Sequence, residues 1–173
     1  MKRVVLMPTG NEISLGTVID TNSPALMELV LEKYPQACVQ RIPPLSDELQ
    51  KIKQAIAAYQ AWDLIILIGG SGGGKKYDPD LAADMSHLAL DSVLQDKFEK
   101  SIYGCNGHLW SRLLIGRLSE GGIIANVPGP YVEAVAAGRA LIAAIAAGQA
   151  LPVVLEKVAA AVFAQYPSGG EIL

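Results

Sequence analysis

A glycine-rich segment directly follows one of the most apolar stretches of the chain. That stretch reads DLIILI over residues 63–68, and GGSGGGKK then runs from Gly69 to Lys76. Glycine lets a backbone approach an anion closely and turn several N–H groups toward it. A single helix terminus holds a charge with only about 0.3–1 kcal/mol, so a phosphate site needs several donors together. Five glycines in six positions exceed what a tight strand-to-helix turn requires. The segment therefore predicts a phosphate-binding loop, with Lys75 adding positive potential and Asp78 available to a divalent cation.

Two familiar nucleotide-binding loops do not fit this segment. The pattern G-x-x-x-x-G-K-[ST] matches from Gly69 until its last position, where Lys76 replaces the hydroxyl that binds magnesium. The dinucleotide pattern G-x-G-x-x-G fails because Gly70 and Gly72 are followed by Lys75 where a third glycine is required. We therefore expect the segment to bind phosphate in a different structural setting.

Apolar runs and helix-start signals alternate along the chain. Strands are predicted over 3–8, 37–42, 63–68 and 121–127, from their short apolar runs. Helices are predicted over 23–33, 46–59, 78 into the nineties, 109–118, 131–148 and 155–165. This alternation implies an α/β fold, a three-layer sandwich in which a mostly parallel sheet carries helices on both faces. We expect one domain over residues 1–173, with Ala-rich C-terminal helices from about residue 131.

Three loops follow predicted strands directly, after Pro8, Ile68 and Val127. In open parallel sheets ligands bind outside the carboxyl ends of the strands. We therefore expect these three loops to meet at one edge of the sheet and to form the binding site.

Composition and charge restrict the class of protein. The chain is 51% hydrophobic and 18% charged, so it is expected to fold, and a net charge of −3 does not favour a nucleic-acid binder. The longest uncharged run, residues 140–155, is too short and too interrupted to span a bilayer. Two cysteines make no disulfide framework, and the apolar run after Lys2 and Arg3 is too short for a signal peptide. We expect a cytoplasmic protein without membrane contact.

The glycine segment resembles the central motif of the molybdopterin-binding domain family. That motif is a strand ending in GGTG, then four residues, then Asp-x-Thr. Here Gly69 to Gly72 read GGSG, and Asp78 matches the aspartate. The spacer is one residue longer than in the family, and Asp80 stands where the family has threonine.

The segment before the first predicted helix is similar to a second family motif, TGDE…G…D-x-N. Residues 9–22 read TGNEISLGTVIDTN, with Asn11 in place of the family's aspartate. The segment keeps four of the motif's residues, Glu12, Gly16, Asp20 and Asn22. It looks more like the insertion and competence-damage branches of the family than like its small adenylyltransferases.

Three further matches follow in the family's order. PLSDE places Asp47 at the family's second acidic position, and LWSRLLIGRL is similar to the L-S-R helix of the small adenylyltransferases through Ser111 and Arg112. NVPGP, over residues 126–130, matches the family's N-[LI]-P-G turn. The resemblance extends from Gly10 to about residue 138.

The resemblance implies a function in molybdenum cofactor biosynthesis. The family includes the small molybdopterin adenylyltransferases of the MoaB/Mog group, the insertion proteins related to gephyrin and the amino-terminal domain of the CinA proteins. For this chain it implies molybdopterin binding and adenylyl transfer from magnesium-ATP to the pterin phosphate. Two alternatives stay open, a binding or delivery module without turnover and a CinA-like pyrophosphatase acting on dinucleotides.

The resemblance also implies roles for individual residues. It assigns Asp47 and Asp78 to catalysis and to magnesium. Binding of the pterin or the nucleotide falls to the matched or neighbouring residues Gly69, Gly70, Ser71, Gly72, Gly73, Gly74, Lys75, Asp20, Asn22, Ser111, Arg112, Pro128 and Gly129.

Several of these residues also have ordinary structural interpretations. Asp47 falls in the first turn of a predicted helix and Asp78 precedes a proline, where both would stabilise a helix start. Asp20 and Asn22 are typical of an Asx turn. Cys105 and His108, with no second cysteine pair, do not make a zinc motif.

The Ala-rich C-terminal region suggests self-association. Between residues 132 and 164 only Glu133, Arg139, Glu156 and Lys157 are charged. Helices that are apolar on most sides need cover from the sheet or from another subunit. We expect a homo-oligomer, and the family resemblance implies a trimer.

Overall fold

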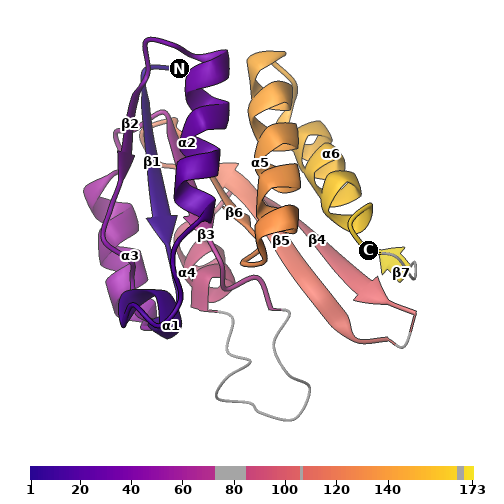
Figure 1. The fold of residues 1–173 in the computed structure, drawn as a ribbon. Coiled ribbons are helices and arrows are strands. Elements are labelled where there is room, and N and C mark those ends of the chain that lie inside the picture. Colours follow the sequence, from indigo (N-terminus) through magenta and orange to yellow (C-terminus); the bar gives the residue numbers. More distant parts are fainter. Residues whose placement is uncertain (73–84, 106, 167–169) are drawn as a thin grey trace.

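Seven strands form one mixed β-sheet in the order β2–β1–β3–β6–β5–β4–β7 (Figure 1). The computed structural model describes residues 1–72, 85–105, 107–166 and 170–173. The strands are β1 (Arg3–Pro8), β2 (Cys38–Arg41), β3 (Leu64–Ile68), β4 (Lys97–Gly104), β5 (Leu109–Arg117), β6 (Ile123–Val127) and β7 (Gly170–Ile172). Helices pack on both faces of this sheet, which confirms the predicted three-layer α/β fold.

The strands β2, β1, β3 and β6 run parallel and correspond to the four predicted strands. The apolar runs of β1 and β3 lack polar alternation because helices cover both faces of the sheet there, whereas the edge strand β2 is mostly exposed. Every residue of β3 is buried. The carboxyl ends of β1, β3 and β6 consequently point to the same edge.

The other half of the sheet is antiparallel, and here one prediction was wrong. The stretch predicted as a helix over 109–118 is strand β5, which pairs with β6 and β4, and β4 pairs in turn with β7. Leu113 and Ile115 pack on one face of the sheet and Leu114 on the other, as the period of a strand requires. An apolar run alone does not distinguish a buried strand from a buried helix. The sheet is therefore mixed, with its parallel strands confined to one half.

Three helices cover one face of the sheet: α2 (Asn22–Lys33), α5 (Tyr131–Ala146) and α6 (Leu151–Phe163). α2 and α5 approach closely because Gly138 has no side chain, and a Cβ there would collide with Leu26. The apolar residues of α5 and α6 are largely buried within the chain, among them Leu141, Val154 and Val158. The sheet and neighbouring helices thus supply much of the cover that these helices need.

The opposite face carries α3 (Leu49–Ala58) and α4 (Met85–Val93), while the short α1 (Asn11–Ser14) follows β1. Ile52 and Ile56 of α3 pack with Leu90 of α4 against the sheet. Among the described residues, no helix combines the length and apolar character needed to cross a membrane.

Candidate functional site at the carboxyl edge of the sheet

Main-chain hydrogen bonds join the three predicted loops at the carboxyl ends of the parallel strands. The N–H of Thr9 donates to the carbonyl of Ile68 at 2.8 Å, and the N–H of Gly69 donates to the carbonyl of Val127 at 3.0 Å. The loop after β2 is connected to the same group of loops, because the N–H of Gly10 donates to the carbonyl of Leu45 at 3.0 Å. The expected meeting of these loops at one edge is confirmed.

The turn after β3 requires glycine at its first two positions. Gly69 has a φ of +95°, and a Cβ there would lie 2.9 Å from the carbonyl oxygen of Thr9. Gly70 has a φ of +62°, and its Cβ would lie 2.5 Å from the hydroxyl of Ser86. A side chain at either position would meet both steric overlap and backbone strain. These glycines therefore bring the turn tightly against β1 and α4.

The same turn presents backbone donors. In the described part of the chain, no protein acceptor receives the N–H of Gly70, Ser71 or Gly72. Successive N–H groups in a turn with positive-φ residues form the kind of concavity that binds anions. Gly72 also has a positive φ, of 85°. Residues 69–72, which we call the glycine turn, thus offer three consecutive donors to a ligand.

Arg112 lies next to the glycine turn, although on a strand rather than on the predicted helix. Its N–H donates to the carbonyl of Ser71 at 2.5 Å. Its side chain lies on the α4 side of the sheet, with Nε 3.8 Å from Glu99 Oε1. Glu99 Oε2 lies in turn 3.0 Å from Nε2 of the buried His87. The main chain of Arg112 therefore contacts this turn, and its guanidinium interacts with the carboxylates of Glu99 and, at longer range, Asp91.

Asp47 lies beside the end of β1 and forms a reciprocal pair with Asn11. Asp47 Oδ2 accepts the N–H of Asn11 at 3.1 Å, and Asn11 Oδ1 accepts the N–H of Asp47 at 3.1 Å. Burial raises the pKa of Asp47 above its ordinary value and outweighs the hydrogen bond from Asn11, and the charge of Glu12 also raises it. A partly buried carboxylate that is poorly stabilised when ionised fits a hard cation such as Mg²⁺.

Asp20 and Asn22 hold the start of α2 against the site. Asp20 Oδ1 accepts the N–H of Ser23 at 3.0 Å and Oδ2 accepts Arg41 Nε at 2.8 Å. Burial tends to raise the pKa of Asp20, but the hydrogen bonds from Ser23 and the contact with Arg41 lower it overall. Asn22 Nδ2 donates to the carbonyl of Gly129 at 2.7 Å. Both side chains thus make contacts that stabilise the start of α2, as the structural interpretation of these residues expects. Their contacts with a ligand stay a prediction.

The predicted turn after β6 packs directly on the glycine turn. A Cβ on Gly129 would lie 3.7 Å from the Cα of Gly69, and Pro128 is buried beside it. The structure therefore brings Asn22, Gly129, Gly69, Ser71 and Arg112 into one continuous series of neighbours.

Some buried polar atoms at this edge have no hydrogen-bond partner in the described part of the chain. They are Asn22 Oδ1, Ser111 Oγ and Arg112 Nε, the last of which has only the longer ion-pair contact with Glu99. Ser111 is 0% exposed. Buried polar atoms normally find hydrogen-bond partners, so these atoms are candidates for contact with a ligand.

Other predicted residues fall outside the described part of the chain. These are Gly73, Gly74, Lys75 and Asp78, together with Lys76 and Asp80. Among the described residues, no group of three His, Cys, Asp or Glu side chains is arranged to hold a metal ion.

Sequence reasoning missed several polar residues of this edge. The hydroxyl of Thr9 lies 2.9 Å from that of Ser86, and both are buried behind the glycine turn. Glu133, in the first turn of α5, is hydrogen-bonded to Tyr166, whose ring stacks on Trp110 with centroids 4.0 Å apart. The position of Thr9 directly after a predicted strand could have marked it as a site residue. Nothing in the sequence indicates the pairs Thr9–Ser86, Glu133–Tyr166 and Trp110–Tyr166, because each joins residues that only the fold brings together.

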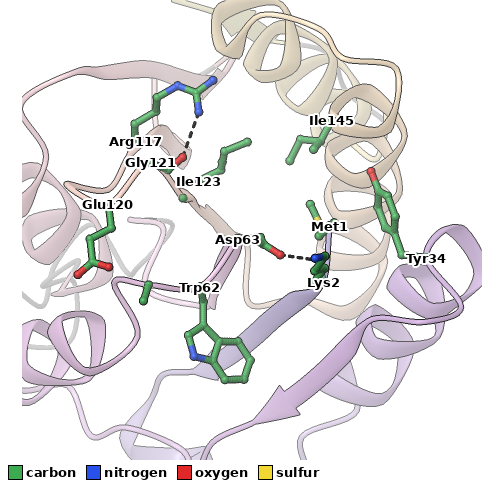
Figure 2. Close-up of a pocket in the computed structure, with 12 residues that line it drawn as sticks. Met1, Lys2, Tyr34, Trp62, Asp63, Arg117, Glu120, Gly121, Ile123 and Ile145 are labelled. Atoms are coloured by element: carbon green, nitrogen blue, oxygen red, sulfur yellow. Dashed lines mark hydrogen bonds between the residues drawn. The ribbon is translucent and has the colours of Figure 1, made fainter.

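A second hollow lies at the opposite edge, at the amino ends of β1, β3 and β6 (Figure 2). Its volume is about 610 Å³, and it carries charged groups on its walls. Asp63 accepts the N–H groups of Lys2 and Arg3 at 2.5 and 2.9 Å, and Arg117 Nη1 donates to the carbonyl of Gly121 at 3.2 Å. These groups already have internal partners, so the hollow is a weaker candidate than the carboxyl edge.

The fold and the carboxyl edge define a class of protein, an α/β domain with a glycine-rich turn after a central parallel strand. The family model described as "Probable molybdopterin binding domain" matches residues 5–147. The chain therefore belongs to the molybdopterin-binding domain family, as its motifs predict. No curated protein matches the chain closely enough to count as a relative.

Solved structures share the fold at low sequence identity. The molybdopterin biosynthesis enzyme MoaB from Thermus thermophilus has a TM-score of 0.60 at 21% identity, covering 97% of this chain and 99% of that one. A molybdopterin biosynthesis protein from Mycobacterium abscessus has a TM-score of 0.62 at 16% identity, covering 95% and 99%. The protein CinA from Thermoplasma acidophilum has a TM-score of 0.51 at 18% identity, covering 75% and 90%. These similarities establish the fold.

Proposed function

We propose that this protein acts in molybdenum cofactor biosynthesis, by binding molybdopterin and transferring an adenylyl group from magnesium-ATP to the pterin phosphate. One observation carries the proposal, the three consecutive N–H groups of the glycine turn that have no acceptor among the described residues. Family membership and the names of the structural neighbours point to the same ligand. We place the protein in the cytoplasm, where ATP is available.

The reaction joins two anions. An oxygen of the pterin phosphate attacks the α-phosphorus of ATP, and the bond from that phosphorus to the bridging oxygen of the β-phosphate breaks. Pyrophosphate leaves with the electron pair of that bond. Such transfers depend on positioning and on stabilisation of charge rather than on a protein nucleophile.

The residues at the carboxyl edge suit these requirements. The N–H groups of the glycine turn and the guanidinium of Arg112 offset the repulsion between the phosphates. Asp47, with Asp78 from outside the described residues, would hold Mg²⁺, which supplies neutralising charge on the nucleotide phosphates. Ser111 Oγ and Asn22 Oδ1 are buried and have no hydrogen-bond partner among the described residues, so they are available to a ligand.

A direct assay tests the proposal. The protein is incubated with molybdopterin, ATP and Mg²⁺, and adenylylated pterin and pyrophosphate are measured. Both products should form, and each should fall at least about 100-fold in Asp47→Ala and in Asp78→Ala. Glu120→Ala, at the opposite edge, is the matched acidic control and should keep wild-type activity.

Other outcomes separate the alternatives. Tight molybdopterin binding without product would favour a binding or delivery module, and binding unchanged in both aspartate variants would contradict the site. A pyrophosphatase would instead hydrolyse NAD with Mg²⁺ to two mononucleotides. The segment around Glu12 motivates that alternative, and in the structure Asn11 of this segment pairs with Asp47.

We also propose that the protein self-associates. The support comes from exposed apolar residues rather than from the Ala-rich helices, whose apolar residues are largely buried within the chain. Half of the large apolar residues that are exposed in the described part of the chain lie around the start of α2 and α5, and they include Leu15 at 78%, Ile19 at 83% and Val132 at 61%. Exposed apolar groups of this size favour a protein interface. A homotrimer by light scattering after size exclusion would support the proposal, whereas a stable monomer would contradict it.

A further inference from the structure

The antiparallel pairing of β5 with β6 stops before either strand ends. The last main-chain pair on this side joins Ile115 to Ala125. β6 nevertheless continues to Val127, and β5 extends back to Leu109. The two strands therefore separate into a fork that opens toward the carboxyl edge.

The side chain of Asn126 fills this fork. Its Oδ1 accepts the N–H of Leu114 at 2.7 Å, and its Nδ2 donates to the carbonyl of Arg112 at 2.9 Å. Asn126 is 1% exposed, so water does not compete for these bonds. One carboxamide thus satisfies a main-chain donor and a main-chain acceptor of β5 beyond the end of the ladder, and the acceptor could not pair with residue 128 in a continued ladder because Pro128 has no N–H.

The glycine turn occupies the rest of the fork. The N–H of Arg112 donates to the carbonyl of Ser71 at 2.5 Å, while the N–H of Gly69 donates to Val127. The turn therefore passes over the end of β6 and reaches β5. If β5 and β6 stayed paired beyond Ala125, β6 would take the place of Ser71.

We propose that Asn126 is a positioning residue that holds the β5–β6 fork open and thereby brings the glycine turn and Arg112 into one anion-binding site. The ligand part of this inference rests on the proposed function, but the fork itself does not. Asparagine suits the role because its short side chain carries one acceptor and two donors. Leucine of similar size would leave Leu114 N–H and Arg112 C=O buried without partners.

The variant Asn126→Asp tests this role reversibly. An ionised carboxylate accepts from Leu114 N–H but repels the carbonyl of Arg112, whereas the protonated form has an acceptor and a donor, as asparagine does. Burial raises the pKa of a carboxyl, by about 3–5 units when it is complete, so at this buried position the carboxyl is expected to be protonated at pH 6.0 and ionised at pH 8.5. Affinity for magnesium-ATP and for pyrophosphate is measured at pH 8.5 and 6.0 by calorimetry. We expect the variant to bind at least about 10-fold more weakly than wild type at pH 8.5, and within about threefold of it at pH 6.0.

Gln149→Glu is the matched control. It makes the same change from carboxamide to carboxyl in the turn between α5 and α6, and it should bind like wild type at both pH values. A loss in Asn126→Asp that is equal at both pH values would overturn the inference, as would wild-type affinity at pH 8.5.

Hydrogen exchange of the wild-type protein provides a test that needs no variant and no ligand. The amide of Arg112 should exchange as slowly as that of Leu114, although it lies outside the β5–β6 ladder. Exchange at the rate of an exposed loop would overturn the inference. If the wild-type protein binds no nucleotide or pterin but Arg112 is protected, the proposed function fails and the fork stands.

Discussion

The two edges of the sheet use their polar groups in opposite ways. At the amino edge, Asp63 accepts two main-chain N–H groups and Arg117 donates to a neighbouring carbonyl, so these two charged side chains have partners within the chain. At the carboxyl edge, the three N–H groups of the glycine turn have no acceptor among the described residues, and Asn22 and Ser111 each have a buried atom with no hydrogen-bond partner there. Polar groups of this kind are a stronger sign of a ligand site than a charged hollow.

Substitution of one arginine at each edge should give the largest difference in binding. Arg112→Ala removes the cation tied to the glycine turn, and affinity for magnesium-ATP and for molybdopterin should fall about 10- to 100-fold. Arg117→Ala, at the amino edge, should stay within about twofold of wild type. Equal losses in the two variants by calorimetry would break the distinction between the edges.

Asp63 should matter for stability but not for binding. Asp63→Ala leaves the N–H groups of Lys2 and Arg3 without their acceptor, which we expect to cost about 1–2 kcal/mol and to lower Tm by about 2–8 °C. Burial tends to raise the pKa of Asp63, but the hydrogen bonds from Lys2 and Arg3 lower it overall.

This lowered pKa determines how the effect varies with pH. The stabilisation by Asp63 is present above its unfolded-state pKa of 3.8 and is lost as pH falls through the lower folded-state value. Thermal unfolding at pH 7 and near pH 2.5 should therefore show a gap between wild type and variant only at pH 7. A loss of nucleotide affinity in Asp63→Ala would contradict the assignment.

Ser111, in contrast to Asp63, should matter for ligand binding but not for stability. Because its buried hydroxyl has no partner in the described part of the chain, Ser111→Ala should leave the stability of the ligand-free protein unchanged or slightly higher. Ligand affinity should fall about fivefold, the equivalent of one hydrogen bond of about 1 kcal/mol. Ser119→Ala is the control, since Ser119 lies near the other edge and donates to Gln60. A clear loss of stability in Ser111→Ala, measured by denaturant unfolding, would show that its hydroxyl is already satisfied.

The smallest effect should come from Asp47 in the absence of metal. Burial raises the pKa of its carboxyl, so the ionised form destabilises the fold as pH rises through the folded-state value. In EDTA at pH 7.5, Asp47→Asn should be slightly more stable than wild type, and the difference should vanish below the unfolded-state pKa of 3.8. Mg²⁺ should then raise the Tm of wild type but not of the variant. A less stable variant in EDTA would contradict a site poised for a cation.

The parallel half of the fold was predictable because its strands are short apolar runs bounded by turns. The loops after Pro8, Ile68 and Val127 were therefore placed at one edge from the sequence. The antiparallel half was not, since the apolar run containing Arg112 fits a buried helix as well as a buried strand. Ser111 and Arg112 were matched by their residue types, yet β5 brings Arg112 to the glycine turn through a main-chain bond that no local pattern encodes.

The role of Asn126 illustrates what local sequence does not contain. The residues that follow it in the sequence predict a turn. Its positioning role, however, depends on where β5 and β6 stop pairing, which only the fold shows. Asp20 shows the converse, because its predicted turn contacts exist and its oxygens are engaged by Ser23 and Arg41. Residue types and their order along the chain therefore locate the edge of the sheet. The hydrogen bonds that each polar group makes within the folded chain decide whether it can still bind a ligand.

Above all, we propose that the glycine turn binds a phosphate group. Crystals soaked with magnesium-ATP or with molybdopterin test it most directly, by the position of the phosphate density. We expect phosphate oxygens within hydrogen-bonding distance of the N–H groups of Gly70, Ser71 and Gly72. Phosphate density in the hollow of Figure 2, with the glycine turn filled by the protein's own side chains, would contradict it.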